Sequence, residues 1–368
     1  MIKFLKEWSG RYLSDPQVII LALLLSLGFF LILTLGKMLA PVIAALVIAY
    51  LLEGLVAGLS RLGTRRMTAV VLVFSVFMTA LLTLLVVLLP MLSHQVGQLI
   101  SELPEMVQKG REAMTDLPER YPDIISEAQI QQILEALAGQ VTAWGQRLIS
   151  LSLASLKGVI TFVVYLILVP FLVFFFLKDK NLILDWIRKF LPRERMLAAS
   201  VWREANRQVG NYVRGKALEI SLLWVATYIT YLLLGLDFAM LVAIGVAVSV
   251  IIPYIGTAVV TIPVVLIAFF QWGFSINVLY VLIAYFVLHT LDANLLVPLL
   301  LSGVVNLHPV AIIVALLVFG GLWGVWGLFF AIPLATLVQA VINAWFARLK
   351  DTDNPANTTT PKKEENNP

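Results

Sequence analysis

The stretch VIILALLLSLGFFLILTLG, residues 18–36, contains no charged side chain. An apolar helix of about 20 residues crosses the roughly 30 Å hydrocarbon core of a bilayer. Similar runs recur from Val18 onward, whereas the alternating short strands typical of a membrane β-barrel do not. The sequence therefore predicts an all-α polytopic membrane protein.

The composition agrees with this prediction. The 368 residues are 60% hydrophobic and 13% charged, whereas soluble domains are about 45–50% apolar. The first run follows Lys3, Lys6 and Arg11, is too long for a signal-peptide core and lacks a small-residue cleavage site. We therefore expect an uncleaved first helix. The chain has no cysteine, which excludes disulfides and thiolate metal sites, and we expect neither a metal site nor a cofactor.

The apolar runs alternate with two polar insertions that have apolar residues at helical spacing, from Ile130 to Leu148 in the first case. We expect a tight turn at Lys37 between the first two spans, and about eight transmembrane helices in all. In the N-terminal half we predict three transmembrane helices in 1–92, an extracytoplasmic amphipathic helical insertion in 93–152 and a fourth transmembrane helix in 153–177. A basic cytoplasmic amphipathic insertion is predicted in 178–215. The chain is then predicted to continue as a C-terminal transmembrane region with broken or re-entrant helices in 216–347 and to end in a disordered cytoplasmic tail in 348–368.

The distribution of lysine and arginine predicts the orientation. The first insertion has eight acids against four bases, and residues 178–219 have ten bases against five acids. Positive loops stay in the cytoplasm. The second insertion is therefore predicted to be cytoplasmic, and so are both termini, since Arg348 and Lys350 follow the last span. An even number of spans follows.

Glycine and proline interrupt two apolar stretches, IIPYIGTAVVTIPVV (251–265) and FGGLWGVWGLFFAIPLA (319–335). Each proline leaves the carbonyl four residues earlier without its helical partner, and such a carbonyl must face protein, water or a ligand. Paired broken segments indicate a transporter's binding site, although packing glycines and ordinary kinks remain an alternative. The predicted gate or hinge residues are Pro253, Gly256, Pro263, Gly320, Gly321, Gly324, Gly327 and Pro333, and the carbonyls freed by Pro253 and Pro333 belong to Ser249 and Phe329.

Six segments resemble a known family. They are LAPVIAALVIAYLLEGL (39–55), VPFLVFFFLKDK (169–180), VGNYVRGKALE (209–219), IPYIGTAVVTIPVV (252–265), LDANLLVPLLLSGVVNLHP (291–309) and FGGLWGVWGLFFAIPLA (319–335). In this order they resemble the autoinducer-2 exporter family, and most closely its PerM-like permeases. The resemblance implies a multi-spanning transporter of about eight helices in the bacterial inner membrane. It also implies export of a quorum-sensing signal or sodium/proton antiport as possible activities. The chain departs from the family in having Gly54 after Glu53, where an acid followed by proline is common.

Ionisable residues inside apolar spans are candidates for function because a charge in mid-bilayer is costly. Asp292 is the strongest candidate, with His289 three residues before it. Asn294 is the second, because Pro298 frees its carbonyl. An acid, an amide and a free carbonyl suit a sodium ion, a proton relay or a hydroxyl-rich solute. The alternative is that Asp292 caps a neighbouring helix near the cytoplasmic end.

Most of the other polar residues fit both a functional and a structural role. Glu53 is either part of the transport pathway or in a surface ion pair near Arg61, and Ser249 joins the pathway through its freed carbonyl. Glu219 lies close to Arg214 and Lys216 at the start of a span, and we interpret it as an interfacial anchor rather than a site. His308 is either a loop turn or the mouth of the pathway.

Several function classes are excluded by missing motifs. In GNYVRGKA (210–217) the glycine spacing of a P-loop is present, but Ala217 replaces the hydroxyl that would bind magnesium. The zinc-protease motif H-E-x-x-H is absent. The basic loop is explained by topology and lipid headgroups, so nucleic-acid binding has no support. We expect that the protein is not an enzyme.

The function predicted from these features is secondary transport. We expect an exporter of a small polar solute, with a quorum-sensing signal as one candidate, that is coupled to H⁺ or Na⁺ by alternating access and forms a homo-oligomer among membrane lipids. A sodium/proton antiporter is the alternative within the same class. A channel or a non-transporting membrane scaffold is the alternative from another class.

Overall fold

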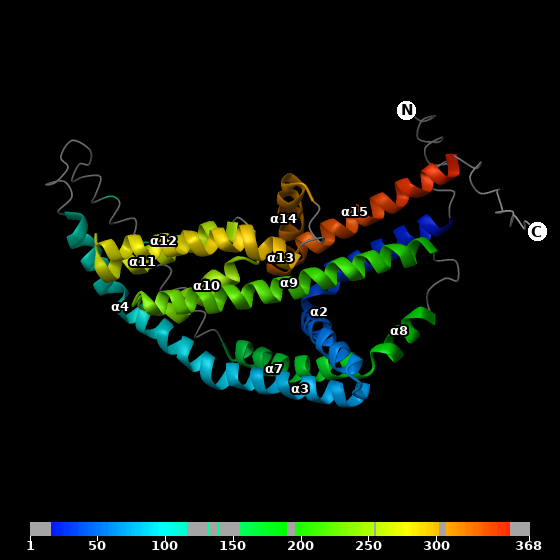
Figure 1. Ribbon diagram of the computed structural model, residues 1–368, viewed down its shortest axis with the longest axis horizontal. Coiled ribbons are helices and arrows are strands. Elements are labelled where there is room, and N and C mark those ends of the chain that lie inside the picture. Colours follow the sequence, from blue (N-terminus) through cyan, green and yellow to red (C-terminus); the bar gives the residue numbers. More distant parts are fainter. Residues whose placement is uncertain are drawn as a thin grey trace, which may run out of the picture. The chain divides into compact units, whose positions relative to one another are not determined.

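The computed structural model describes residues 16–115, 132, 139, 155–189, 196–253, 255–301 and 307–353. Every regular element in these ranges is a helix (Figure 1). Six of the described helical runs are long and apolar enough to cross a membrane, and three more are apolar but shorter. The predicted fold class, an all-α polytopic membrane protein, is confirmed. The number of eight spans stays a prediction.

Helix α2 (Pro16–Arg61) runs through Lys37 without interruption. The turn expected there was wrong. Gly36 and Lys37 stand between good helix formers such as Leu35 and Met38, and one glycine costs a helix only about 1 kcal/mol. A turn inside an apolar run would also expose backbone polar groups. Continuing the helix is therefore the more stable solution.

The next helical run begins with α3 (Arg66–Thr83), passes through a π-helical turn, η1 (Leu84–Leu88), and continues as α4 (Leu89–Thr115). The predicted insertion boundary at residue 93 therefore lies inside a helix. The rest of that insertion, with the stripe from Ile130 to Leu148, lies outside the described ranges.

Helices α2, α3 and α7 (Ser155–Lys178) share a hydrophobic core. Its buried residues are mostly small, which lets the helix backbones approach closely in a membrane. They are Ala45, Ala49, Val56, Ala69, Val70, Val73, Val173 and Leu177. The short helix α8 (Lys180–Lys189) follows α7 after a single residue and begins the basic insertion.

A second core is formed by α9 (Met196–Leu233), α10 (Ala239–Ser249), α11 (Ile255–Trp272) and α12 (Ile276–Leu291). Leu223 and Tyr231 of α9 are in one cluster with Val281 and Tyr285 of α12. Helix α12 continues through a π-helical turn, η2 (Asp292–Leu296), into α13 (Val297–Leu301). This arrangement places α9 and α12 along each other, as Figure 1 shows.

The chain divides into two compact units. One contains residues of 41–180 and 213–302, and the other contains residues of 1–40, 181–212 and 303–368. The second unit includes α14 (Pro309–Trp323) and α15 (Val325–Asp353), which are separated by Gly324. Helix α15 extends beyond residue 348, where the tail was predicted to start, and residues 354–368 lie outside the described ranges.

Candidate functional site

One face of α9 carries polar side chains into the protein. Glu219, Leu223, Thr227 and Tyr231 recur every four residues, and each exposes no more than 1% of its surface. Residues four apart lie on the same side of a helix. The opposite side of α9 is exposed and apolar, with Leu218, Leu222, Val225 and Ile229. The helix is thus polar inside and apolar outside, as expected of a membrane helix that lines a functional interior.

Lys216 and Glu219 form a buried ion pair at the start of this face. The Lys216 Nζ donates a hydrogen bond to the Glu219 Oε1 over 2.7 Å, and the two side chains are 5% and 1% exposed. The other carboxylate oxygen, Glu219 Oε2, is buried and has no hydrogen-bond partner among the described atoms. The pair therefore retains unused capacity to accept a proton, a water molecule or a cation.

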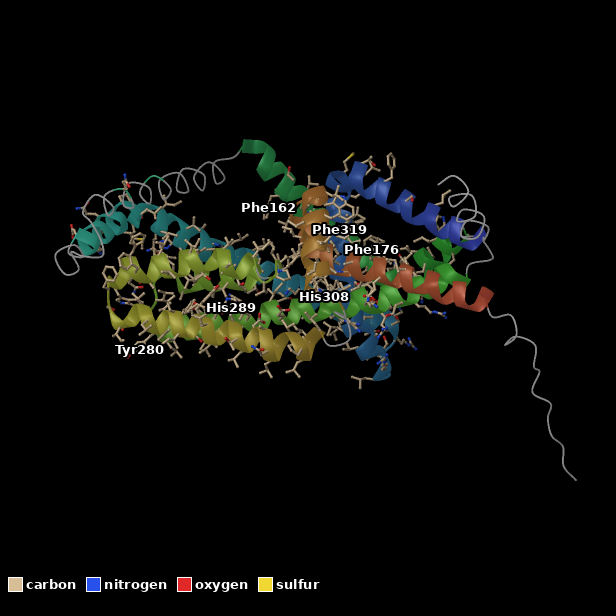
Figure 2. The ribbon with its side chains drawn as sticks, turned by 90° about the horizontal axis from the view of Figure 1, so that it is seen from above. Phe162, Phe176, Tyr280, His289, His308 and Phe319 are labelled. Carbon is tan, nitrogen blue, oxygen red and sulfur yellow. The ribbon has the colours of Figure 1, made fainter. Side chains whose placement is uncertain are left out.

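Asp292 lies on the inner face of α12 and η2, in register with His289 and Tyr285. It is 5% exposed, and its Oδ1 has no partner within the described part of the chain. The His289 ring meets the Tyr285 ring edge to face, with 4.3 Å between centroids. Figure 2 shows His289 among the helices and Tyr280, which is 50% exposed, at the outer side of α12.

The wide turn η2 begins at Asp292, whose carbonyl accepts from the Val297 N–H, five residues later. Pro298 lacks an N–H and cannot continue the α-helical pattern at Asn294. A single π-helical turn is a common response to such an interruption, and these turns are frequent at functional sites. The irregular backbone predicted around Pro298 is therefore present, in the form of a widened turn rather than a break.

The structure brings Asp292 together with the buried ion pair. Asp292 interacts electrostatically with Glu219 and Lys216. Helices α9 and α13 approach each other closely beside these residues because Gly215 has no side chain: a Cβ there would lie 2.6 Å from the Leu300 carbonyl oxygen. We call Lys216, Glu219 and Asp292 the buried triad. It contains two carboxyl groups and one ammonium group in the membrane-spanning part of the protein.

Three other predicted pathway residues do not join the buried triad. Asn294 is exposed, and its Nδ2 donates to the Thr290 carbonyl over 2.8 Å on its own helix. Pro298 is also exposed. The Ser249 carbonyl, which Pro253 was expected to leave free, accepts from the Ile252 N–H over 3.1 Å. It is therefore satisfied by a tight turn.

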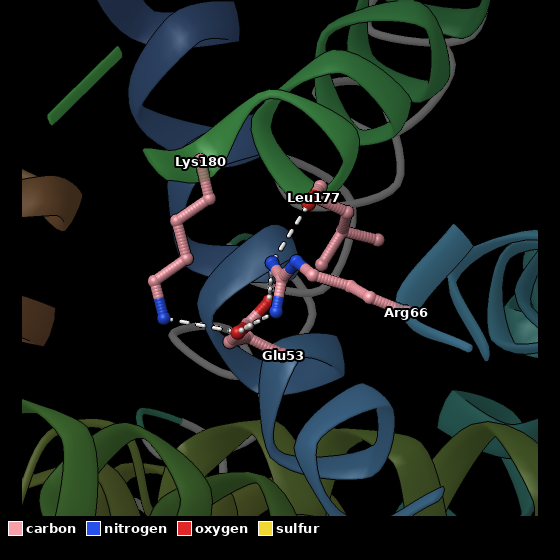
Figure 3. Close-up of polar contacts among 4 residues, drawn as sticks. All are labelled: Glu53, Arg66, Leu177 and Lys180. Carbon is pink, nitrogen blue, oxygen red and sulfur yellow. Dashed lines mark hydrogen bonds and ion pairs between the residues drawn. The ribbon is translucent and has the colours of Figure 1, made fainter. Parts of the chain in front are cut away.

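Glu53 belongs to a different ionic cluster (Figure 3). Arg66 donates to both of its carboxylate oxygens, over 3.0 and 3.1 Å, and Lys180 donates to Oε1 over 2.9 Å. Arg66 also donates to the Leu177 carbonyl at the end of α7 over 3.0 Å. This clamp joins α2, α3 and the α7 to α8 junction. The ion-pair reading of Glu53 thus has a structural basis, with Arg66 and Lys180 as partners in place of Arg61.

Both predicted gate segments are sharp breaks between helices. At the first, which includes Pro253, a Cβ on Gly256 would lie 1.8 Å from the Ser249 carbonyl oxygen. At the second, Gly324 has a φ of 60°, and a Cβ on Gly327 would lie 1.8 Å from the Phe319 carbonyl oxygen. Only glycine permits backbone contact this close.

The remaining predicted hinge residues surround these two breaks. A Cβ on Gly320 would lie 2.6 Å from Leu328, whereas one on Gly321 would meet open space. Pro263 and Pro333 lie inside helices α11 and α15. The carbonyl freed by Pro333, that of Phe329, accepts from the Tyr212 hydroxyl over 3.4 Å. His308 caps α14 by accepting from the Val310 N–H, while its neighbour Asn306 lies outside the described residues.

The comparisons with known proteins agree with this architecture. The family model described as "AI-2E family transporter" matches residues 18–347. The chain belongs to the AI-2E transporter family. It is 45% identical over 345 residues to "Putative permease PerM" of Escherichia coli K12, covering 94% of this chain and 98% of the relative. It is also 28% identical over 296 residues to "Putative transport protein YueF" of Bacillus subtilis, covering 77% of each chain.

Membership of the AI-2E transporter family establishes the broad role. The protein is a multi-pass membrane transporter, and a solute and the surrounding lipids are its partners. The resemblance to this family and to PerM-like permeases, predicted from six segments, is confirmed.

Sequence reasoning missed half of the buried face in this AI-2E transporter. Lys216 and Glu219 were interpreted as interfacial anchors, and Thr227 and Tyr231 were not singled out. One signal could have found them: Glu219, Thr227 and Tyr231 repeat at multiples of four residues within an otherwise apolar helix. Such a polar stripe on a membrane helix indicates a face turned toward the interior.

Proposed function

We propose that the protein is a secondary transporter that exports a small polar solute, with a quorum-sensing signal as one candidate, and is driven by a proton or sodium gradient. The observation that carries this proposal is the composition of the buried triad. Both carboxyl groups and the ammonium group are at least 95% buried, and each carboxyl group has one oxygen without a hydrogen-bond partner among the described residues.

The charges of the buried triad require a mobile cation. If Glu219 and Asp292 are both ionised, Lys216 balances only one of them. An unbalanced buried charge is strongly destabilising. A proton on Asp292 or a sodium ion on the free oxygens would restore neutrality, because carboxylate oxygens are suitable ligands for either. Loading and release of this cation on opposite sides of the membrane would couple its gradient to transport.

The two broken helix pairs are suited to act as the moving gate. Glycine allows the chain at Gly256, Gly324 and Gly327 to pass backbone against backbone without a side chain between. Alternating access needs two arrangements that differ by a few kcal/mol, and breaks between helices are common hinges. We therefore assign the segments 253–263 and 320–333 to the gate.

We further propose that the protein lies in the bacterial cytoplasmic membrane as a homo-oligomer, with both termini in the cytoplasm. The support for the orientation is the positive charge of the segments between spans and at their ends, which contain Arg66, Lys180, Arg188 and Lys189, since positive segments stay inside. The 93–152 insertion would then be extracytoplasmic.

A sodium/proton antiporter is the second candidate. It is favoured by the tight enclosure of the triad, since Glu219 Oε2 and Asp292 Oδ1 are both buried. An enclosed site of this kind suits a small ion better than an organic solute. In such a protein the two ions would compete for the buried triad, and no organic solute would be required.

Transport in proteoliposomes tests both candidates. Purified protein would be reconstituted with a panel of small hydroxylated solutes under an imposed proton or sodium gradient. The wild type should show saturable, gradient-dependent flux, and Asp292→Asn should lose the coupling. Asn294→Ala is the matched control, because Asn294 is exposed on the same turn and bonded to its own helix. Full rate and full coupling in Asp292→Asn would remove the triad from the mechanism.

The remaining outcomes separate the alternatives. Ion exchange without solute flux would identify the antiporter. Currents that neither saturate nor depend on an imposed gradient would identify a channel. The absence of any flux, together with a stable partner bound through the 93–152 insertion, would identify a scaffold.

A further inference from the structure

A row of polar groups without partners extends beyond the buried triad. On α9 these atoms are Trp224 Nε1, Thr227 Oγ1 and Tyr231 OH, and on α12 the His289 Nε2. Thr227 and Tyr231 are 0% exposed. A buried polar atom with no hydrogen bond is uncommon in a native protein, and each one calls for an explanation such as a bound water or another conformation.

These atoms belong to two antiparallel helices that share one hydrophobic core. At one end Asp292 interacts electrostatically with Glu219, and at the other end Tyr231 and Tyr285 are buried in the same cluster. Residue numbers thus rise along α9 as they fall along α12. Thr227 lies between the two ends on α9, and His289 lies between them on α12. We call the set of inward-facing residues Thr227, Tyr231, Tyr285 and His289 the α9–α12 seam.

The two sides of the α9–α12 seam differ in hydrogen bonding. On the α12 side, the Tyr285 hydroxyl donates to the Thr257 carbonyl over 2.6 Å and accepts from the Thr261 hydroxyl over 2.9 Å. Tyr285 is thereby fixed to α11. On the α9 side, the hydroxyls of Thr227 and Tyr231 have no partner in the described chain. Among the hydroxyl groups of the seam, the two on α9 are therefore the ones that this conformation leaves unsatisfied, together with the His289 Nε2 on α12.

Aliphatic side chains would fill the same space without this penalty, as Leu223 and Val281 do within the same cluster. Hydroxyl and imidazole groups become favourable at these positions when water reaches them. We propose that the α9–α12 seam is the water-lined access path to the buried triad and that the structure shows this path closed. The inference rests on the proposed function, since it supplies the route by which the coupling ion reaches Asp292.

Cysteine labelling tests this proposal directly, because the chain contains no cysteine of its own. Thr227→Cys would be reconstituted and exposed on both faces to a charged, membrane-impermeant methanethiosulfonate reagent while an ion gradient drives the protein. Ile229→Cys is the matched control on the exposed, apolar side of α9. Lys109→Cys is the positive control, since the Lys109 side chain is 59% exposed and lies beyond Met106, the last residue of its candidate span.

The seam predicts that Thr227→Cys reacts at least about tenfold faster than Ile229→Cys, since a thiol reacts as the hydrated thiolate. Labelling at Thr227→Cys should also block flux. If Lys109→Cys is labelled but Thr227→Cys reacts no faster than Ile229→Cys, the proposal that the seam is an access path is contradicted. Labelling that leaves flux at the wild-type rate overturns it as well.

Tyr231→Phe provides a second measurement that does not depend on labelling. Because the Tyr231 hydroxyl has no partner, its removal should leave the melting temperature equal or higher and should slow transport. Tyr285→Phe is the control, and it should melt lower because it loses the bonds to Thr257 and Thr261. A lower melting temperature for Tyr231→Phe, or an unchanged transport rate, contradicts the proposal.

The labelling result and the transport result are separable. A slow reaction at Thr227→Cys combined with uncoupling by Asp292→Asn would overturn the access path and retain the transporter. Fast labelling at Thr227→Cys without any gradient-driven flux would retain the hydrated seam and overturn the coupled transporter.

Discussion

Two ionic clusters of the same helical unit differ in how many of their carboxylate oxygens accept hydrogen bonds. In the clamp formed by Glu53, Arg66 and Lys180, both carboxylate oxygens accept hydrogen bonds and two cations face one acid. In the buried triad, two acids share Lys216, and each acid has an oxygen without a partner among the described residues. The Glu53 side chain is 18% exposed, whereas that of Glu219 is 1% exposed.

In the proposed function, this difference separates a structural contact from one that takes part in transport. A carboxylate with every oxygen bonded to a cation has nothing left to bind and holds three helices together. In the proposed function, a pair of acids with one shared cation binds a further cation that neutralises the second acid and is later released. Saturation of hydrogen bonds, more than the mere presence of an acid in a span, therefore distinguishes the two roles.

The largest expected effect is on stability at Lys216. Lys216→Met leaves two carboxyl groups buried without a cation, which should cost about 3–5 kcal/mol of unfolding free energy. Lys180→Met is the matched control and should cost about 1 kcal/mol or less, because Lys180 is 41% exposed and Glu53 keeps both bonds to Arg66. Chemical unfolding in detergent micelles measures both, and equal costs would break the comparison.

The second prediction compares the effects of one substitution in each cluster on stability and on transport. Glu53→Gln loses the charge-assisted bonds from Arg66 and Lys180 and should destabilise the fold by about 2 kcal/mol, while flux per folded protein stays near wild type. Asp292→Asn should keep its melting temperature and lose about tenfold or more in gradient-driven flux. Thermal unfolding and proteoliposome flux, measured on the same preparations, check the pair. The reverse pattern would show that the roles of the two clusters had been exchanged.

A smaller effect is expected from Arg66→Lys. Lysine keeps the charge but cannot donate to both oxygens of Glu53 and to the Leu177 carbonyl at once. The expected loss is about 1 kcal/mol, with transport unchanged. Thermal unfolding measures it, with Arg188→Lys as control, since Arg188 has an exposed partner on its own helix. A loss as large as that of Lys216→Met would contradict the ranking.

The smallest effect concerns salt. Exposed ion pairs are screened at high ionic strength, whereas buried pairs are screened much less. Raising the salt concentration should therefore reduce the stabilisation that Arg66 gives by a few tenths of a kcal/mol, and should leave the contribution of Lys216 almost unchanged. Melting curves of wild type, Arg66→Met and Lys216→Met at low and high salt measure these differences, because both substitutions remove the charge. A strong salt dependence at Lys216 would mean that the triad is open to water in the resting protein.

The sequence was sufficient to predict what depends on composition and spacing. Apolar runs predicted the helical membrane fold, six ordered segments indicated the family, and an acid in a span pointed to Asp292. Pro298 predicted irregular backbone beside it. These features are local, so their physical cause is contained within a few turns of chain.

Contacts between distant segments could not be predicted in this way. Glu219 looked like an interfacial anchor because its burial depends on Gly215 meeting Leu300, which lies 85 residues later. Glu53 was compared with the nearby Arg61, whereas the structure pairs it with Lys180, 127 residues away. Asn294 was selected because Pro298 frees its carbonyl, but its side chain lies two residues after Asp292, about half a helical turn, and is exposed. The prediction of a turn at Lys37 was wrong because neither Gly36 nor Lys37 is sufficient to end a helix.

The widened turn at Asp292–Leu296 also sets the helical phase of everything that follows it. A π-helical turn holds one residue more than the α-helical repeat, so α13 is rotated by about 100° from the direction that α12 alone would give it. That rotation directs the Leu300 carbonyl toward Gly215. Deleting one residue between 293 and 296 would preserve α12 and the position of Asp292 but turn α13 away from α9. The length of this segment, rather than the identity of its side chains, therefore keeps α13 packed against α9 beside the buried triad.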